Sequence, residues 1–325
     1  MKWNIKMMML LMLASTVMVM SSTNWMSMWI GMEINMVSFV PIMKMNNKES
    51  SSSTMIYFMT QSMGSSLFLY SLLSMWFQSP SSHSSSMMIM MMASMMIKMG
   101  LPPMHMWMVI VMNNLSWSSC FMLMTWQKIA PLTVTSKLTQ MINETYIMAM
   151  MAAIIGAIGG INQTSIRKIM AYSSVSHMGW MITMSTNNTK WISYLFIYSM
   201  MVATLCYMLN SENMFYLNQL NLMETTNKMA FTINMLSMGG LPPMIGFLPK
   251  WMAIQTMINN NLIIIASVMV MTSLVTLMFY VNMIMPMMSL STTMNKSNLT
   301  YEKNYSWMLI MSMMTPLALT MNVVI

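Results

Sequence analysis

Long apolar segments separated by short polar connectors dominate this sequence. Eleven of them are long enough to cross a bilayer as a helix, which takes about 20 residues. They lie near residues 7–22, 25–43, 55–77, 86–112, 117–136, 144–161, 168–186, 190–210, 226–257, 261–286 and 305–325. Connectors such as NNKESSSST and NKSNLTYEKN are too short to hold a soluble domain. The pattern predicts an all-α polytopic membrane protein with about 11 transmembrane helices, in a single membrane domain over residues 1–325.

The composition excludes a soluble protein. Only 6% of the residues are charged, against about 25% in soluble domains, and Asp is absent. The net charge of +8 is scattered along the chain and forms no basic patch, so we expect no nucleic acid as a partner. The 63 methionines are spread through every span, which favours a biased genome, such as an AT-rich mitochondrial one, over a methionine-lined binding groove.

The basic residues predict an orientation, because Lys and Arg accumulate in the inside loops of membrane proteins. With the N-terminus inside, nine basic residues fall in inside loops, and only Lys137 and Lys190 fall in outside loops. The nine are Lys2, Lys6, Lys44, Lys48, Arg167, Lys168, Lys228, Lys296 and Lys303. An odd number of spans then places the C-terminus outside.

Four ionisable residues lie within spans rather than in connectors: Glu33, Lys98, Lys128 and Lys250. A charge in the middle of a span costs about 2.5–3.5 kcal/mol and is a functional candidate by default. The alternatives are snorkelling of a lysine to the interface, or a structural ion pair, which fits Glu33 best. Burial favours the neutral form of an amine and a nearby carboxylate favours the charged form. We therefore expect Glu33 and Lys98 to approach within about 4–8 Å.

The sequence Gly-Leu-Pro-Pro occurs twice, in KMGLPPMHMW (98–107) and in GGLPPMIGFLPKW (239–251). A proline leaves the carbonyl four residues earlier without its helical hydrogen bond, so Pro102 frees the carbonyl of Lys98 and Pro131 that of Gln127. Interrupted spans at matching places in two halves indicate an ion path in transporters. The two segments, 86–112 and 226–257, are therefore predicted to be broken helices of two inverted repeats beside water that satisfies the freed carbonyls. A pair of purely structural kinks is the alternative.

Five stretches resemble the subunit 2 family of mitochondrial NADH dehydrogenase (complex I), an antiporter-like membrane subunit. They are WIGMEIN (29–35), KMGLPPMHMW (98–107), LMTWQKIAPL (123–132), GGINQTSIRKIMAYSSVSHMGWM (159–181) and LSMGGLPPMIGFLPKW (236–251). The resemblance covers nearly the whole chain. The resemblance implies a proton-translocating helical module with inverted repeats.

The resemblance also implies residue roles. The acid and the three lysines of the family's central polar axis fall on Glu33, Lys98, Lys128 and Lys250. His105 is a secondary candidate. After the Trp of HMW, where the family usually has a Pro–Glu pair, this chain has Val109 and Ile110, so no acid is expected at that helix end.

The stretch RKIMAYSSVSHMGW allows two interpretations. His177 could be a further protonatable group on the path, or the small residues around it could serve dense helix packing. We favour packing. Cys120 and Cys206 both lie in apolar spans and are predicted to be buried thiols, in neither a disulfide nor a metal site.

The resemblance finally implies a function. The chain would be a core membrane-arm subunit of complex I, a non-redox subunit of NADH:ubiquinone reductase that couples electron transfer to proton translocation through a buried Glu/Lys relay. No redox-cofactor motif occurs in this chain, so NAD, FMN, iron–sulfur clusters and ubiquinone are expected in other subunits.

The expected partners are the other membrane and peripheral subunits, lipids, protons and ordered water. The expected location is the mitochondrial inner membrane, with the N-terminus in the matrix and the C-terminus in the intermembrane space. The alternatives are a stand-alone cation/proton antiporter of the same superfamily, or a structural membrane scaffold.

Overall fold

The computed structural model describes residues 2–44, 48–77, 84–139, 145–186, 190–223 and 225–289. This part of the chain contains thirteen α-helices and one 3-10 helix. They are α1 (Lys2–Ser21), α2 (Trp25–Met43), α3 (Lys48–Phe77), α4 (Ser84–Met99), α5 (Met106–Asn114), α6 (Trp117–Met124), α7 (Trp126–Thr139), α8 (Thr145–Gly160), α9 (Ile166–Ser185), α10 (Lys190–Ser211), η1 (Leu217–Leu222), α11 (Thr225–Gly239), α12 (Phe247–Asn259) and α13 (Ile263–Ser289). The last predicted span, 305–325, lies outside the described residues.

The other ten predicted spans each coincide with one helix or with a pair of consecutive helices. One boundary was wrong. The serine-rich stretch after Lys48 was predicted to be a connector, but it forms the first turns of α3. Serine is tolerated there because its hydroxyl bonds to the helix backbone itself, as Ser53 Oγ does to the carbonyl of Ser50 at 2.8 Å.

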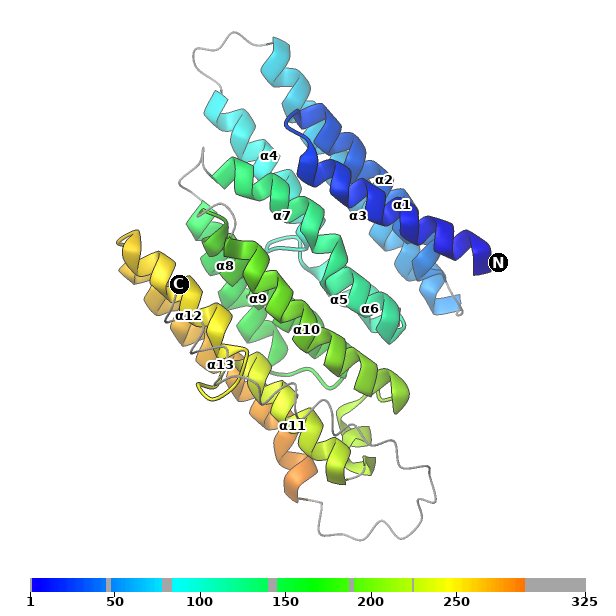
Figure 1. Cartoon of the computed structure of the whole chain (residues 1–325), viewed down its shortest axis with the longest axis vertical. Helices are drawn as coiled ribbons and strands as arrows, with labels where there is room; N and C mark the ends of the chain where they lie inside the picture. Colours follow the sequence, from blue (N-terminus) through cyan, green and yellow to red (C-terminus); the bar gives the residue numbers. More distant parts are fainter. Residues whose placement is uncertain are drawn as a thin grey trace.

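Both Gly-Leu-Pro-Pro sequences interrupt a helix. α4 ends at Met99 and α5 begins at Met106, while α11 ends at Gly239 and α12 begins at Phe247. Gly100 and Gly240 open the two interruptions with φ values of +69° and +80°, a left-handed conformation that glycine adopts without steric cost. In Figure 1 both interruptions lie part-way along the bundle rather than at its ends.

A third interruption, between α6 and α7, contradicts the prediction of one helix over 117–136. The break falls at Thr125, where neither Pro nor Gly occurs. The Thr125 hydroxyl bonds to the carbonyl of Phe121 at 2.8 Å, and such back-bonding bends helices. Pro131, in contrast, is accommodated inside α7.

The helices lie side by side along a common direction, with α1 to α3 at one edge of the bundle and α11 to α13 at the other (Figure 1). α9 lies between them and contacts α5, α7, α8, α10, α12 and α13. Its residues from Ile169 to Ser185 are all buried. This central position explains why α9 is rich in small and polar residues.

The small residues of α9 pack closely against α8. A Cβ atom at Gly179 would lie 2.7 Å from the carbonyl oxygen of Ala149, and one at Gly156 would lie 2.6 Å from the amide nitrogen of Ser176. These distances leave no room for a side chain. The favoured interpretation of this stretch, dense helix packing, therefore holds for the side of α9 that faces α8.

The described connectors lie at the two ends of the bundle, as the predicted topology requires. At one end, Trp117 Nε1 donates to the carbonyl of Met214 at 3.0 Å, and Arg167 donates to the carbonyl of Leu115 at 2.7 Å. At the other end, Lys137 Nζ donates to the carbonyl of Ser22 at 2.6 Å. Lys228 corrects one detail, because it lies buried in the first turns of α11 rather than in a loop.

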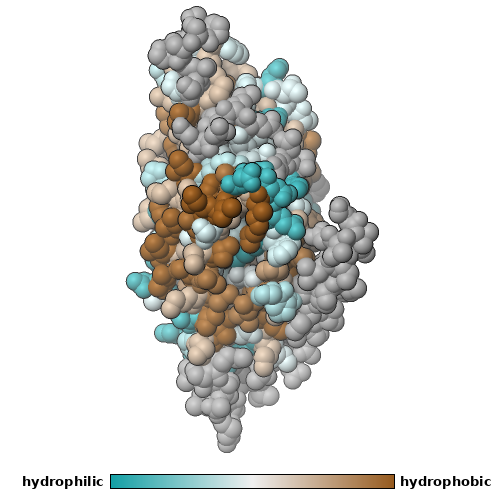
Figure 2. All heavy atoms as spheres, turned by 90° about the vertical axis from the view of Figure 1, so that its left-hand side faces the viewer, coloured by the Kyte–Doolittle hydropathy of each residue, from teal (hydrophilic) through white to brown (hydrophobic). Residues whose placement is uncertain are grey.

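Large apolar side chains are exposed on the outer helices, including Met7 and Val17 on α1 and Ile264 and Met271 on α13. Figure 2 shows hydrophobic residues spread over much of the face that it draws. Three described helices are long and apolar enough to cross a membrane by themselves, namely Trp25–Met43, Lys190–Ser211 and Ile263–Met287. Three of the predicted membrane crossings are each formed by two consecutive helices, namely α4–α5, α6–α7 and α11–α12. The single helices of these pairs are shorter than the length needed to cross a membrane.

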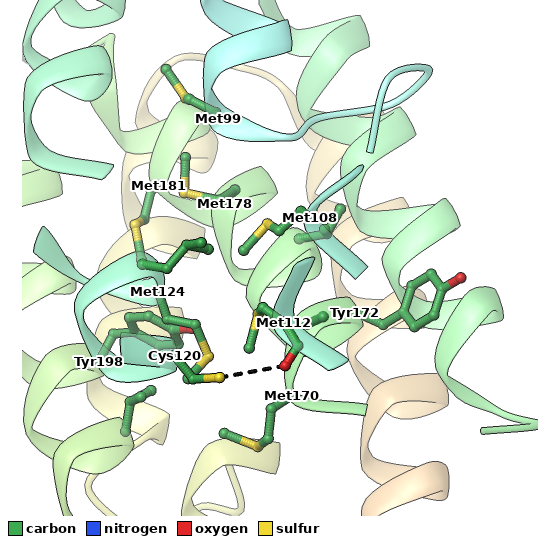
Figure 3. Close-up of a cluster of buried hydrophobic side chains, with 14 of the residues drawn as sticks. Met99, Met108, Met112, Cys120, Met124, Met170, Tyr172, Met178, Met181 and Tyr198 are labelled. Carbon is green, nitrogen blue, oxygen red and sulfur yellow. Dashed lines mark hydrogen bonds between the residues drawn. The ribbon is translucent and has the colours of Figure 1, made fainter. Parts of the chain in front are cut away.

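Cys120 and Cys206 are buried free thiols, which confirms the prediction. Cys120 Sγ donates to the carbonyl of Met112 at 3.5 Å. Met112, Met124 and Met170, from α5, α6 and α9, belong to the same buried cluster as Cys120 (Figure 3).

Candidate functional site

The site begins with an ion pair between α2 and α4. Lys98 Nζ lies 3.7 Å from Glu33 Oε1, slightly closer than expected from the sequence. The side chain of Lys98 is 4% exposed and that of Glu33 is 26% exposed. The lysine is thus enclosed, and its counter-charge stands at the edge of the enclosed region. Met32 Sδ, at 4.0 Å, is a second neighbour of the ammonium group.

The carbonyls at the end of α4 are satisfied by side chains. Gln61 Nε2, from α3, donates to the carbonyl of Lys98 at 3.0 Å, and Trp107 Nε1 donates to that of Ile97 at 3.0 Å. The sequence predicted water at the carbonyl freed by Pro102. Gln61 takes that place because α3 packs along α4 and α5. The end of α4, which carries Lys98, is therefore fixed to a neighbouring helix.

Lys128 lies on α7, one turn after the break at Thr125, and is 2% exposed. Its Nζ atom donates to the carbonyl of Ser174, on α9, at 3.1 Å. It also lies 5.3 Å from the centre of the Tyr198 ring, on α10. A carbonyl dipole and an aromatic face both stabilise a cation, so a proton can reside here without a carboxylate.

Lys250 lies on α12, just after the second interruption, and is also buried. Its Nζ atom donates to the carbonyl of Gly239 at 2.6 Å, which joins the two halves of the broken helix. The two interruptions differ here. At the first, the side chain of Gln61, from another helix, donates a hydrogen bond to the carbonyl of Lys98. At the second, Lys250 itself donates to the carbonyl of Gly239.

His177 shares an aromatic neighbour with Lys128. It is buried on α9, with its Nδ1 atom 2.8 Å from the Tyr194 hydroxyl. Its ring centre lies 4.9 Å from that of Tyr198, the ring that also lies 5.3 Å from Lys128 Nζ. The sequence left open whether His177 belongs to the path, and the structure places it beside the surroundings of Lys128.

His105 occupies a different environment. It is half-buried in the first interruption, with Nδ1 3.3 Å from the carbonyl oxygen of Pro103 and its ring 6.0 Å from that of Tyr172. Among the contacts of the described residues, those of His105 include none of the four charged residues of the site. Val109 faces the core and Ile110 is exposed, so the missing acid leaves no gap in the site.

A cavity joins Lys98 to Lys128. Tyr57, Gln61 and Gln127 form its polar wall between the two lysines. A second, smaller cavity reaches Lys98 from the side of Asn35. The first cavity has room for about one water molecule. Two buried proton-binding groups on one polar cavity can exchange a proton through water.

Sequence reasoning missed the amide and hydroxyl groups of this wall. Gln61, Tyr57 and Gln127 lie in spans where their burial cost resembles that of many Ser and Thr residues, so the sequence did not single them out. One signal was available. Asn35 and Gln127 both stand in stretches that carry a site residue, WIGMEIN and LMTWQKIAPL.

Methionine sulfur atoms contact several polar groups of the site. Gln127 Nε2 lies 3.3 Å from Met12 Sδ, and Ser174 Oγ lies 3.8 Å from Met108 Sδ. Figure 3 shows Met108, Met124 and Met178 in the same cluster of buried side chains as Tyr198. Sulfur is a weak acceptor, so these contacts reduce the cost of burying the polar groups without fixing them strongly.

Residues 22–276 match the family model described as NADH:quinone oxidoreductase/Mrp antiporter, TM. The chain is also 38% identical over 309 residues to NADH-ubiquinone oxidoreductase chain 2 of Anopheles gambiae, a match that covers 92% of this chain and 87% of the relative. The chain belongs to the NADH-ubiquinone oxidoreductase chain 2 family. The chain 2 family is a multi-pass membrane family, which agrees with the helical bundle described here.

Solved structures show how widely the fold of this chain 2 family member occurs. A chain of respiratory complex I from Thermus thermophilus, solved with bound aureothin, matches with a TM-score of 0.78 and 17% identity over 87% of this chain and 70% of that one. A chain of the Mrp complex from Dietzia matches with a TM-score of 0.77 and 16% identity, over 85% of this chain and 59% of that one. The chain therefore has an antiporter-like fold.

The described residues contain no group of three His, Cys, Asp or Glu side chains that could hold a metal ion. The polar side chains of the site in this chain 2 family member are lysines, one acid, a histidine, amides and hydroxyls. Amines, carboxylates and imidazoles bind and release protons, and amides and hydroxyls form hydrogen bonds.

Proposed function

We propose that this chain moves protons through the membrane along Glu33, Lys98, Lys128 and Lys250, as a core membrane subunit of respiratory complex I. Family membership makes it a non-redox subunit of NADH:ubiquinone oxidoreductase. One observation carries the relay. Three buried lysines lie on three different crossings, the first is paired with an acid, and polar groups fill the intervals.

In this relay a proton passes from one amine to the next. Glu33 stabilises the ammonium form of Lys98 at 3.7 Å. Displacement of the acid lowers the affinity of Lys98 for its proton. The proton crosses the cavity of Tyr57 and Gln127 to Lys128, whose neighbours are neutral. His177 then offers a route from Lys128 to Lys250. Each step breaks one N–H bond and forms another, with no covalent change to the chain.

We propose further that the two broken helices are equivalent elements of an inverted repeat. The α4–α5 pair is the fourth crossing of the bundle and the α11–α12 pair is the ninth. Four crossings lie between them, so the pairs run in opposite directions, as inverted repeats require. Gly100 and Gly240 give both interruptions the same left-handed opening.

The energy for translocation comes in this proposal from neighbouring subunits. NAD, FMN, iron–sulfur clusters and ubiquinone are assigned to those subunits, since the sequence contains no motif for them. Lipids cover the exposed apolar residues of the outer helices, and ordered water occupies the cavities. We place the chain in the mitochondrial inner membrane with its N-terminus in the matrix. Its relatives and the distribution of basic residues support that placement.

A stand-alone cation/proton antiporter is the second candidate. The likeness to a chain of the Mrp complex, with a TM-score of 0.77, supports it at the level of the fold. The 38% identity to chain 2 of NADH-ubiquinone oxidoreductase favours complex I. A structural scaffold is disfavoured because it has no need for three buried lysines, each costing about 2.5–3.5 kcal/mol.

The test replaces Lys98 in the whole complex. Lys98→Arg keeps the ion pair with Glu33, but arginine does not release its proton, so proton pumping should fall at least about tenfold. Lys98→Met removes both the charge and its burial cost, and should likewise stop pumping while the complex still assembles. Pumping is measured as acidification inside liposomes that contain the purified complex, with NADH and a quinone supplied.

Lys44→Arg is the matched control, because Lys44 is exposed at the end of α2. If Lys98→Arg pumps at the normal rate, Lys98 is not a proton carrier. If Lys98→Met prevents assembly while Lys98→Arg restores both assembly and pumping, the ion pair with Glu33 is structural.

A further inference from the structure

Gln127 is held from two sides at the wall between Lys98 and Lys128. Its Oε1 atom accepts a hydrogen bond from the Tyr57 hydroxyl, on α3, at 3.2 Å. Its Nε2 atom donates to Asn35 Oδ1, on α2, at 3.2 Å. Three helices thus meet at one side-chain amide. An amide with partners on both atoms cannot rotate without breaking both hydrogen bonds.

The two cavities of the site meet at this amide. Gln127, Tyr57, Gln61 and Lys98 line both of them, but only one of the two is lined by Lys128. Tyr57 is 2% exposed and Asn35 is 4% exposed, so bulk water does not compete for their hydrogen bonds. Gln127, which is half-buried, therefore lines the cavity that lies between Lys98 and Lys128.

The donors and acceptors of the Gln127 amide determine whether it can bind a water molecule in the cavity. A side-chain amide has two N–H donors and an oxygen that accepts twice. The two donors are directed to Asn35 Oδ1 and to Met12 Sδ, which lies 3.3 Å from Nε2. One position of Oε1 is taken by Tyr57. A single acceptor position remains, and it can orient the hydrogen of a water molecule in the cavity.

We propose that Gln127, held by Tyr57 and Asn35, is a positioning residue for proton transfer between Lys98 and Lys128. A water molecule that donates one hydrogen to Gln127 Oε1 presents its oxygen to the Lys98 ammonium and its other hydrogen to the neutral amine of Lys128. In the transfer, an N–H bond of Lys98 breaks as an O–H bond forms. The other O–H bond breaks as an N–H bond of Lys128 forms, and the water is restored. This inference rests on the proposed relay.

The experiment uses the whole complex in liposomes and compares pumping in H₂O and D₂O. Gln127→Leu removes the amide at similar size, and pumping should fall about tenfold, because a misplaced bridging group slows transfer strongly. The solvent isotope effect on pumping should rise, since transfer through water becomes rate-limiting. Tyr57→Phe removes one of the two hydrogen bonds that hold the amide, and should change both measurements in the same direction by a smaller factor.

Two variants serve as matched controls. Gln255→Leu makes the same change on the exposed side of α12, and Tyr70→Phe makes it on the exposed side of α3. Both should leave the pumping rate and the isotope effect at their normal values. A purely structural role for Gln127 would lower the amount of assembled complex in proportion to pumping, without changing the isotope effect.

The outcomes separate this inference from the relay on which it rests. If Lys98→Met and Lys128→Met leave pumping intact, the relay and the positioning role both fail. If those variants stop pumping but Gln127→Leu and Tyr57→Phe pump normally with an unchanged isotope effect, only the positioning role fails. Should Gln127→Leu not assemble, Tyr57→Phe decides by itself, because it removes a single oxygen atom.

Discussion

Lys98, Lys128 and Lys250 are buried to a similar degree but have different partners. Lys98 faces the carboxylate of Glu33, which stabilises only the charged amine. Lys128 and Lys250 donate to backbone carbonyls, on Ser174 and Gly239, and a neutral amine can keep such a hydrogen bond. Lys98 is therefore the position where the charge depends most on a single neighbour, the carboxylate of Glu33.

Tyr194 provides a test of the step between Lys128 and Lys250. Tyr194→Phe removes the hydroxyl that lies 2.8 Å from His177 Nδ1, leaving a buried ring nitrogen unpaired at a cost of about 1–3 kcal/mol. If His177 belongs to the path, pumping should fall several-fold as the ring loses its orientation. Pumping and the thermal unfolding of the complex are measured together, with Tyr70→Phe as the exposed control. A lower unfolding temperature with normal pumping would make His177 structural.

The charged residues of the site could be predicted from the sequence, and the amides could not. A lysine or glutamate inside a span is conspicuous because its burial is costly. Gln61 and Tyr57 carry no charge, and their role depends on which helices become neighbours. That information is held in the packing of α3 against α2, α4 and α5, which no local pattern reveals.

At the scale of the helices, the three interruptions also differ in whether the local sequence predicts them. Those at Gly-Leu-Pro-Pro follow from local chemistry, because proline removes a hydrogen bond and glycine permits a positive φ. The interruption at Thr125 has neither residue and was missed. Threonine is common inside helices of this chain, so its back-bonded hydroxyl becomes a break only where the tertiary contacts of α6 and α7 favour one.

A substitution at Gly240 tests whether the second interruption matters for stability and pumping. Gly240→Ala places a side chain at φ +80°, and its Cβ would lie 2.8 to 3.1 Å from the end of the Lys250 side chain. A left-handed non-glycine residue costs roughly 1–2 kcal/mol, and displaced Lys250 would lose its bond to the carbonyl of Gly239. We expect a lower unfolding temperature and reduced pumping.

The neighbouring residue supplies the control. A Cβ at Gly239 would make ordinary contacts of 3.5 Å or more, and Gly239 ends a regular helix. Gly239→Ala should therefore leave stability and pumping near normal. Equal behaviour of the two variants would show that the left-handed opening and the position of Lys250 are unimportant.

At the scale of the whole molecule, exposed lysines at opposite ends make the orientation testable. Lys6 and Lys44 are exposed at one end of the bundle and Lys190 at the other. A membrane-impermeant amine reagent should label Lys6 and Lys44 only in inside-out inner-membrane vesicles, and Lys190 only in right-side-out ones. Mass spectrometry identifies the labelled peptides. Labelling of Lys44 from the intermembrane-space side would reverse the orientation. Lys296 and Lys303 were predicted to lie in inside loops like Lys44, but they are not among the described residues.

The methionine contacts of the site bear on how a charge travels. A fixed dipole, such as a carbonyl, stabilises a proton at one place and so holds it there. The electron cloud of a thioether deforms toward a cation wherever the cation stands. Met32 Sδ lies 4.0 Å from the Lys98 ammonium group and can act in this way, and Met108 lines the cavity shared by Lys98 and Lys128. A polarizable lining lowers the energy of the charge along its route without creating a trap, so an abundance of methionine leaves this interior well suited to a moving proton.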